Sequence, residues 1–139
     1  MRRSTAVLGC LLSALLAAGC DNGPETAPTP TPTPIVETFT GTLNLNGAMT
    51  HTFNATAAGT VTATISALEP NSSIVGFQIG TWSAAAGVCT IVLSNDIATL
   101  QSAHTAITQS SASLCARLHD PNGLLTEGPV TYTLTVNHP

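Results

Sequence analysis

Short runs in which hydrophobic and polar residues alternate make up the chain from Val36 onward, separated by clusters of Gly, Asn, Asp and Pro. Successive side chains of a β-strand point to opposite faces, so this alternation predicts strands with one buried and one exposed face. The predicted strands cover residues 36–43, 48–55, 60–67, 74–82, 88–93, 106–109, 114–118 and 130–136. This pattern indicates an all-β fold, an antiparallel β-sandwich of seven or eight strands.

Two segments near these strands carry further local information. Asn46-Gly47, between the first two predicted strands, suits the positive φ of a tight turn. The first three predicted strands are therefore expected to be antiparallel neighbours. Further along, Ile97, Leu100 and His104 have helical spacing, which leaves open one or two turns of helix before the brief sixth strand.

The first residues have the pattern of an export signal. Arg2 and Arg3 precede an apolar run, residues 6–18, that is shorter than the roughly 20 residues of a membrane-spanning helix. The run ends in Leu-Ala-Ala-Gly-Cys, which resembles the lipobox of bacterial lipoproteins, and Cys20 is then the residue that carries a diacylglycerol and an acyl chain. An ordinary secretory signal with an incidental cysteine is the alternative. The lipobox predicts a signal peptide over residues 1–19 and a bacterial envelope protein, held by lipid and facing the periplasm or the exterior.

Residues 20–35 differ in composition from everything around them. They contain alternating Thr-Pro pairs and no apolar periodicity, so they cannot bury a core. Proline favours extended conformations, which makes this segment a semi-rigid tether of roughly 3.1 Å per residue. The sequence thus predicts a lipid-carrying linker over 20–35 and a single domain over 36–139.

The charge of the chain restricts the kinds of partner it can bind, and its cysteines indicate the compartment in which it folds. The chain has no lysine and a net charge of −4. Removal of the signal leaves Arg117 against seven carboxylates, so nucleic acid is not an expected partner. Once Cys10 leaves with the signal and Cys20 takes lipid, Cys89 and Cys115 are the remaining pair, and export predicts a disulfide between them. A free or metal-bound pair is the alternative.

Several strand segments resemble the bacterial pre-peptidase C-terminal (PPC) domain family. They are residues 39–43 (Phe-Thr-Gly-Thr-Leu), 51–53 (His-Thr-Phe), 57–62, 114–118 and 128–134. The resemblance implies a jelly-roll-like β-sandwich that acts as a noncatalytic accessory or binding module. The acidic segment usual in the middle strand of that family is replaced here by Ile74-Val75-Gly76-Phe77, so calcium or collagen binding is not carried over.

Catalytic and metal-binding chemistry is not predicted. The chain has no Gly-x-Ser-x-Gly motif, and its four histidines lack the paired spacing of zinc ligands. His51 is expected to be a hydrogen-bonded histidine at the edge of the core. Oxygen-bearing side chains surround the turn after Asp120, but a β-turn explains them better than a calcium loop. No cofactor is expected.

The candidate ligand-binding residues are Trp82, His119 and Asp120. Trp82 is the only tryptophan, and an exposed indole stacks on sugar rings or anchors a protein partner; as a cover over small core residues it needs no function. The sequence therefore predicts a lipid-anchored, noncatalytic binding module outside the cytoplasm, with a glycan or an envelope protein as ligand. The alternative is a structural envelope lipoprotein that spaces or supports a membrane complex.

Overall fold

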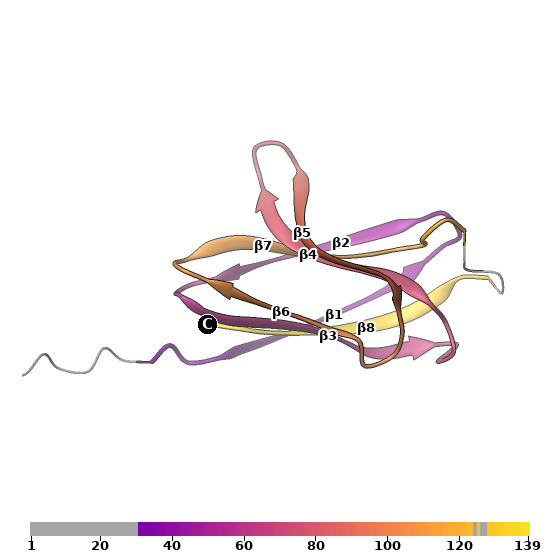
Figure 1. Ribbon diagram of the computed structural model, residues 1–139, viewed down its shortest axis with the longest axis horizontal. Coiled ribbons are helices and arrows are strands. Elements are labelled where there is room, and N and C mark those ends of the chain that lie inside the picture. The colour runs from indigo at the N-terminus through magenta and orange to yellow at the C-terminus, as the bar shows by residue number, and fades with distance from the viewer. Residues whose placement is uncertain (1–30, 124, 126–127) are drawn as a thin grey trace, which may run out of the picture. The chain divides into compact units, whose positions relative to one another are not determined.

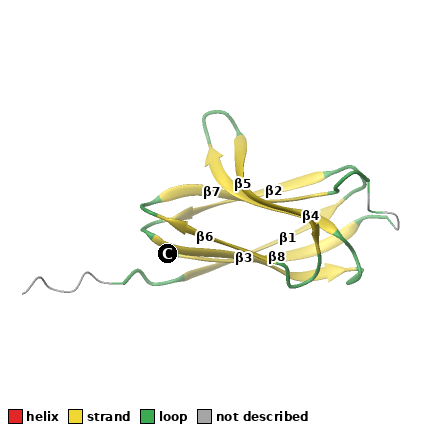
Figure 2. Ribbon diagram, viewed as in Figure 1, coloured by secondary structure: helices red, strands yellow, loops and turns green. Residues whose placement is uncertain are grey.

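A computed structural model describes residues 31–123, 125 and 128–139, and the segment Thr31–Pro139 forms one unit. Eight β-strands run through it (Figure 2): β1 (Ile35–Leu43), β2 (Ala48–Ala55), β3 (Gly59–Glu69), β4 (Val75–Ser83), β5 (Val88–Ala98), β6 (Ala103–Thr108), β7 (Ala112–His119) and β8 (Val130–His138). Among the described residues, no helix is long and apolar enough to span a membrane. The predicted signal peptide, Cys20 and most of the predicted linker lie outside the described residues.

The strands form two four-stranded antiparallel sheets, which lie one above the other in Figure 1. Sheet A has the order β1-β8-β3-β6, and sheet B has the order β2-β7-β4-β5. The predicted all-β sandwich is confirmed, with eight strands. Of the strands that follow one another in the chain, β4 and β5 are hydrogen-bonded neighbours, whereas each of the other connections crosses from one sheet to the other.

The prediction that the first three strands are antiparallel neighbours is wrong, because β1 pairs with β8, β2 with β7, and β3 with β8 and β6. The turn after β1 does have the expected geometry, with φ 56° at Asn46. Asp120, just after β7, binds this turn. The Asn46 N–H donates to Asp120 Oδ2 at 2.7 Å, and the Asp120 N–H donates to the Gly47 carbonyl at 3.0 Å. These bonds hold the start of β2 beside the end of β7.

The helical turns considered around Ile97 are also wrong. β5 and β6 cover most of that stretch, and the brief strand predicted at 106–109 is the longer β6. The turn between them is fixed by β3, since the Gln101 N–H donates to the Ile65 carbonyl at 2.9 Å and the Ile65 N–H donates to the Ser102 carbonyl at 3.0 Å. Of the two apolar residues in this spacing, Leu100 packs partly buried against the core, whereas the Ile97 side chain is 74% exposed.

Alternation along β3 and β8 builds much of the core, as predicted, whereas β4 is buried at consecutive positions and β6 has no fully buried residue. The largest buried apolar side chains come from both sheets and include Leu43, Val61, Ile65, Val75, Phe77, Leu118, Leu134 and Val136. The opposite face of sheet A carries threonines, paired across β1 and β8 as Thr38–Thr135, Thr40–Thr133 and Thr42–Thr131. Sheet A therefore presents a largely uncharged hydroxyl surface, and burial between the sheets stabilises the sandwich.

A disulfide joins Cys89 of β5 to Cys115 of β7, with a Cα–Cα distance of 5.9 Å, so the predicted bridge is confirmed. Neighbouring Leu114 and Ala116 face the core, which directs Cys115 to the outer face of sheet B. Cys115 is nevertheless inaccessible to solvent. The bridge ties the edge strand β5 to the centre of its sheet.

Candidate functional site

The outer face of sheet B gathers the polar residues of β7 and β4. Arg117 and His119 lie on β7, and the strand register places Gln78 opposite Arg117 and Gly76 opposite His119. Arg117 is the one arginine or lysine within the described ranges. The surroundings of Arg117 are therefore a candidate site for binding an anionic or polar group.

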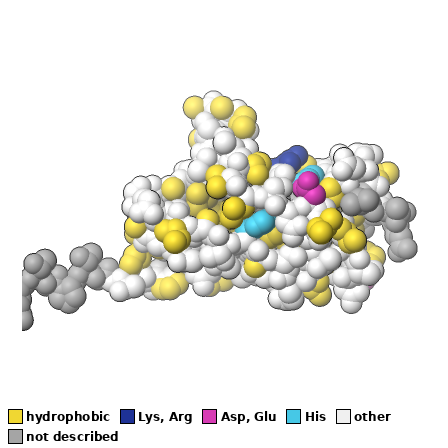
Figure 3. Space-filling view, in the orientation of Figure 1, with side chains coloured by type: hydrophobic (Ala, Val, Ile, Leu, Met, Phe, Trp, Pro, Cys, Tyr) yellow, Lys and Arg dark blue, Asp and Glu magenta, His cyan; other side chains and the backbone are white. Residues whose placement is uncertain are grey.

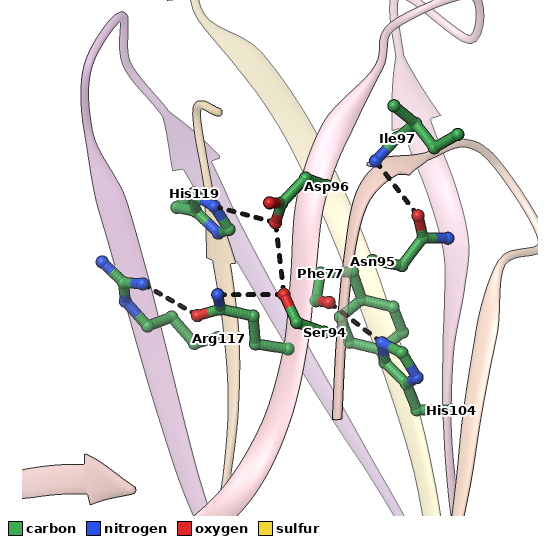
Figure 4. A network of polar contacts seen from close by, with 9 residues as sticks. Phe77, Ser94, Asn95, Asp96, Ile97, His104, Arg117 and His119 are labelled. Carbon is green, nitrogen blue, oxygen red and sulfur yellow. Dashed lines mark hydrogen bonds and ion pairs between the residues drawn. The ribbon is translucent and has the colours of Figure 1, made fainter. Parts of the chain in front are cut away.

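A chain of polar contacts runs across this face from β7 to β5 (Figure 4). Arg117 Nη1 donates to Gln78 Oε1 at 2.8 Å, and Gln78 Nε2 donates to Ser94 Oγ at 3.2 Å. Ser94 Oγ donates to Asp96 Oδ1 at 3.2 Å, and that oxygen lies 3.5 Å from His119 Nε2. The contacts hold the guanidinium and the carboxylate at opposite ends of one network, where each is oriented by a neutral amide or hydroxyl.

The ring of His119 is packed onto the backbone of β4. A Cβ atom added at Gly76 would collide with the His119 ring, so the glycine makes the space that the ring fills. Burial lowers the pKa of His119 below its usual value near 6.5; Arg117 lowers it further, and Asp96 and Asp120 raise it by less. Within the described residues, His119 Nδ1 is buried and has no hydrogen-bond partner. The lowered pKa favours the neutral imidazole of His119 over an ion pair with Asp96.

Asp120 belongs to the scaffold around two loops. Its Oδ2 accepts the Asn46 N–H described above, and its Oδ1 accepts the Leu125 N–H at 3.1 Å. Its side chain is largely buried, and both oxygens are engaged by backbone groups. Glu127, which follows the turn after Asp120 in the sequence, lies outside the described residues. No group of three or more His, Cys, Asp or Glu side chains suited to a metal ion occurs in the described ranges.

Trp82 lies far from His119 on the same sheet. It pairs with Cys89 near the tip of the β4–β5 hairpin and is half-buried beside the disulfide. The residue opposite His119 is Gly76, six positions along β4, which corresponds to roughly 20 Å. The fold therefore does not bring the predicted ligand-binding residues together into one site, and their roles in binding stay predictions.

The other histidines have contacts within the scaffold. His51 Nε2 shares a 2.7 Å hydrogen bond with Tyr132 Oη, and its ring stacks on Phe39 with centroids 4.9 Å apart. The expected core-edge histidine is confirmed, and burial lowers its pKa. His104 Nε2 lies 2.9 Å from the Phe77 carbonyl, and His138 Nε2 lies 2.8 Å from a Glu37 carboxylate oxygen.

The β4–β5 hairpin projects away from the sandwich (Figure 1). Its tip, residues 84–87, is exposed, and the Gly87 N–H closes the turn by donating to the Ser83 carbonyl at 2.8 Å. Val88 and Val92 on its second strand are 50% and 63% exposed. The disulfide from Cys89, close to the tip of this exposed and partly apolar hairpin, gives the protein a protruding surface whose position is held by a covalent bond to β7.

An apolar groove lies at the open side of the sandwich, next to this hairpin. It has a volume of about 220 Å³, with Val61, Ile79 and Leu114 of the core at its floor and Val92 and Ile107 at its rims. Figure 3 shows hydrophobic side chains gathered on the side of the molecule where β5 and β6 face the viewer. The groove reaches the core because no further strand covers the edges of β5 and β6.

Sequence reasoning missed both this groove and the polar network. The signal for the groove was the run Ile91-Val92-Leu93, since three consecutive apolar residues cannot all face one side of a strand. The ladder between β4 and β5 has a register shift at this point, and Val92 is left exposed. The network had no comparable signal, because Gln78, Ser94 and Asp96 are ordinary outward-facing polar residues.

Comparisons with known proteins give one informative likeness. No protein-family model matches the chain, and no curated protein matches it, so the PPC resemblance rests on the sequence motifs alone. Among solved structures, the chain is similar to the crystal structure of PliG from Aeromonas hydrophila, a periplasmic lysozyme inhibitor of g-type lysozyme. The TM-score is 0.54 at 18% identity, and the match covers 73% of this chain and 83% of PliG. At this identity the likeness establishes a shared fold.

Proposed function

We propose that the chain is an exported, lipid-anchored domain that binds a protein partner outside the cytoplasm and has no catalytic activity of its own. The observation that carries this proposal is the protruding β4–β5 hairpin, joined to β7 by the Cys89–Cys115 disulfide. A hairpin held in place before binding loses little conformational freedom on association, which favours affinity.

Compartment and partner class follow from two further observations. Disulfides persist in oxidising spaces such as the periplasm, which supports export. The fold is shared with a periplasmic inhibitor whose target is a protein, which favours a protein partner over a glycan. A lysozyme is accordingly the first partner to test. The single tryptophan is half-buried at the disulfide and does not form an open platform for sugar stacking.

The absence of catalysis is proposed from the roles of the polar side chains. His51, His104 and His138 are each committed to a contact within the scaffold, and both Asp120 oxygens accept backbone N–H groups. His119 lies beside the Asp96 carboxylate, and the described part of the chain places no serine or cysteine in a hydrogen bond with its ring. These contacts of the polar side chains therefore fit a binding protein better than an enzyme.

The proposal is tested with the full chain carrying Cys20→Ser, which removes the lipid attachment residue. Isothermal titration against a g-type lysozyme, a c-type lysozyme and peptidoglycan fragments separates the ligand classes. We expect saturable binding to a protein and none to the glycan fragments. The matched variant Ala85→Asp, at the exposed hairpin tip, should weaken that binding, whereas Thr40→Asp on sheet A should not.

Two outcomes would contradict the proposal. Saturable binding of peptidoglycan fragments, abolished by Trp82→Ala, would assign the domain to glycans. Hydrolysis of any of these substrates by the purified chain, lost on one Ser or His substitution, would make it an enzyme. If neither lysozyme binds, photocrosslinking from position 85 in cells decides between another protein partner and none.

A further inference from the structure

The side of the sandwich formed by β5 and β6 is unusually apolar. Both are end strands of their sheets, and both line the same groove. Half of the ten exposed large hydrophobic side chains lie on these two strands: Val88, Ile91, Val92, Ile97 and Ile107. Natural proteins protect free strand edges with lysine, proline or a covering segment. The sequence of β6, Ala-His-Thr-Ala-Ile-Thr, contains neither lysine nor proline.

We propose that this groove takes up an aliphatic or aromatic side chain from a basic protein partner, so that the partner is bound by the β5–β6 edge together with the hairpin. The inference rests on the proposed function and names its contact surface. For clarity the groove is called the β5–β6 groove. Its rims are Val92, 63% exposed, and Ile107, 71% exposed, and its floor is the core itself.

The size and lining of the β5–β6 groove suit an apolar anchor. A volume of about 220 Å³ is below the usual range for drug-sized ligands but accommodates one or two side chains. Thr81, Thr108 and Ser110 add hydroxyls at the margin, and no charged residue lines it. Anchors of this kind, buried in a desolvated pocket at the centre of an interface, supply most of the energy of protein association.

Charge indicates the nature of the partner. In the described ranges, one cation, Arg117, stands against four carboxylates, those of Glu37, Glu69, Asp96 and Asp120. The Asp120 side chain is largely buried, but the net charge is still negative, and Asp96 on β5 is exposed on the same strand as Val92. Complementary charge raises association rates and selects against like-charged proteins, so a basic partner is favoured.

The experiment places a photocrosslinking amino acid in the full chain, in cells, at four positions. Positions 92 and 107 lie at the rims of the β5–β6 groove, and positions 40 and 133 lie on the threonine face of sheet A. We expect one adduct, the same from 92 and 107, containing a protein of basic isoelectric point that is identified by mass spectrometry. Positions 40 and 133 should give no such adduct.

The identified partner is then purified and titrated against three variants that each add one carboxylate. Ile107→Asp and Val92→Asp should weaken binding roughly tenfold or more, because a charge at the groove opposes burial of an apolar anchor. Thr40→Asp should change the affinity by less than about twofold. Since all three side chains are exposed, equal urea midpoints are expected, and they confirm that the fold is unchanged.

Failure of this inference is distinguishable from failure of the proposed function. Adducts from positions 40 and 133 alone, or full affinity in Ile107→Asp, would reject the groove while leaving a protein-binding domain. An adduct of twice the chain's own mass, or an acidic partner, would reject the basic partner. No adduct from positions 85, 92, 107, 40 or 133 would reject both.

Discussion

At the scale of residues, two glycines leave the space that polar aromatic rings of this domain occupy. Gly76 leaves the space for the His119 ring, and Gly41 does the same for Tyr132, whose hydroxyl bonds His51. Both glycines lie in strands, where an alanine would be sterically ordinary if the ring opposite were absent. Their importance is therefore in packing across the strand and not in backbone conformation.

Gly76→Ala should destabilise the domain by about 1–3 kcal/mol, the range for an added methyl in a well-packed site. The new Cβ collides with the His119 ring, which must move. Urea unfolding measures the change, and Thr42→Ala, on an exposed position of β1, is the control, expected within about 0.5 kcal/mol.

A double-mutant cycle tests the cause. In Gly76→Ala/His119→Ala the ring is gone, so the methyl should cost much less than it does beside His119. Additive losses in the double variant would show that the ring is not what opposes the methyl.

The lowered pKa values of two histidines predict that the free energy of unfolding depends on pH. Burial lowers the pKa of both His51 and His119 below the usual value near 6.5, so the unfolded chain binds protons more readily than the folded one. Their contribution is fully present above pH 6.5 and is lost as the pH falls below it. Urea midpoints of the wild type should therefore fall between pH 7.5 and 5.

His51→Gln isolates one contribution. Glutamine stays neutral over this pH range and still offers a hydrogen bond to Tyr132, so the variant should lose less stability than the wild type between pH 7.5 and 5. An unchanged pH profile in this variant would assign the titration to other groups.

At the scale of elements, the hairpin β4–β5 differs from every other connection. Its two strands are adjacent in one sheet, whereas the other turns carry the chain between sheets. β5 lies at the edge of sheet B and contacts β7 only weakly, so the Cys89–Cys115 bridge is its covalent tie to a central strand. The element proposed to meet the partner is thus the one that a disulfide holds in place.

The double variant Cys89→Ala/Cys115→Ala should unfold with about 3–4 kcal/mol less free energy, the loop-closure estimate for a separation of 26 residues. Thermal and urea unfolding measure the loss. A reducing agent should lower the stability of the wild type towards that of the variant and leave the variant itself unchanged. Equal stability of the oxidised wild type and the double variant would contradict a stabilising bridge.

At the scale of the whole molecule, the domain combines an uncharged threonine face, an anionic remainder and one apolar side. The threonine face of sheet A has a hollow with Thr40, Thr131 and Thr133 in its lining, and the apolar side lies at the opposite end of the strand order from β1 and β2. Such an asymmetric distribution suits a domain that is tethered at one point and meets a partner with one side.

The tether itself is tested by fractionation. Cys20→Ser should release the protein from the membrane fraction, because the predicted diacylglycerol would have no sulfur to be attached to. Cys10→Ser is the matched control, since this residue lies within the predicted signal peptide, and it should remain with the membrane. The intact mass of the wild type should show a lipid increment at Cys20; membrane association of Cys20→Ser would contradict the predicted anchor.

The amino-acid sequence by itself determined most of the strands, the faces that they bury and the disulfide. Alternation is a local property, so Val61, Ala63 and Ile65 specify the inner face of β3 whatever strand lies beside it. The disulfide could be predicted because Cys89 and Cys115 are the two cysteines that remain once the predicted signal peptide and the predicted lipid attachment account for the others. Of the site residues, His51 was placed correctly for the same local reason, its position on the face that carries Phe53.

Only the tertiary structure decided which strands are neighbours and which edges stay open. Backbone hydrogen bonds carry no sequence information, so the alternating pattern of β1 fits β2 as well as β8. Long-range contacts, such as those between Asp120 and the turn at Asn46, accompany the observed pairing of β2 with β7. The β5–β6 groove arises in the same way, because its rims belong to different sheets and meet only when the two sheets pack.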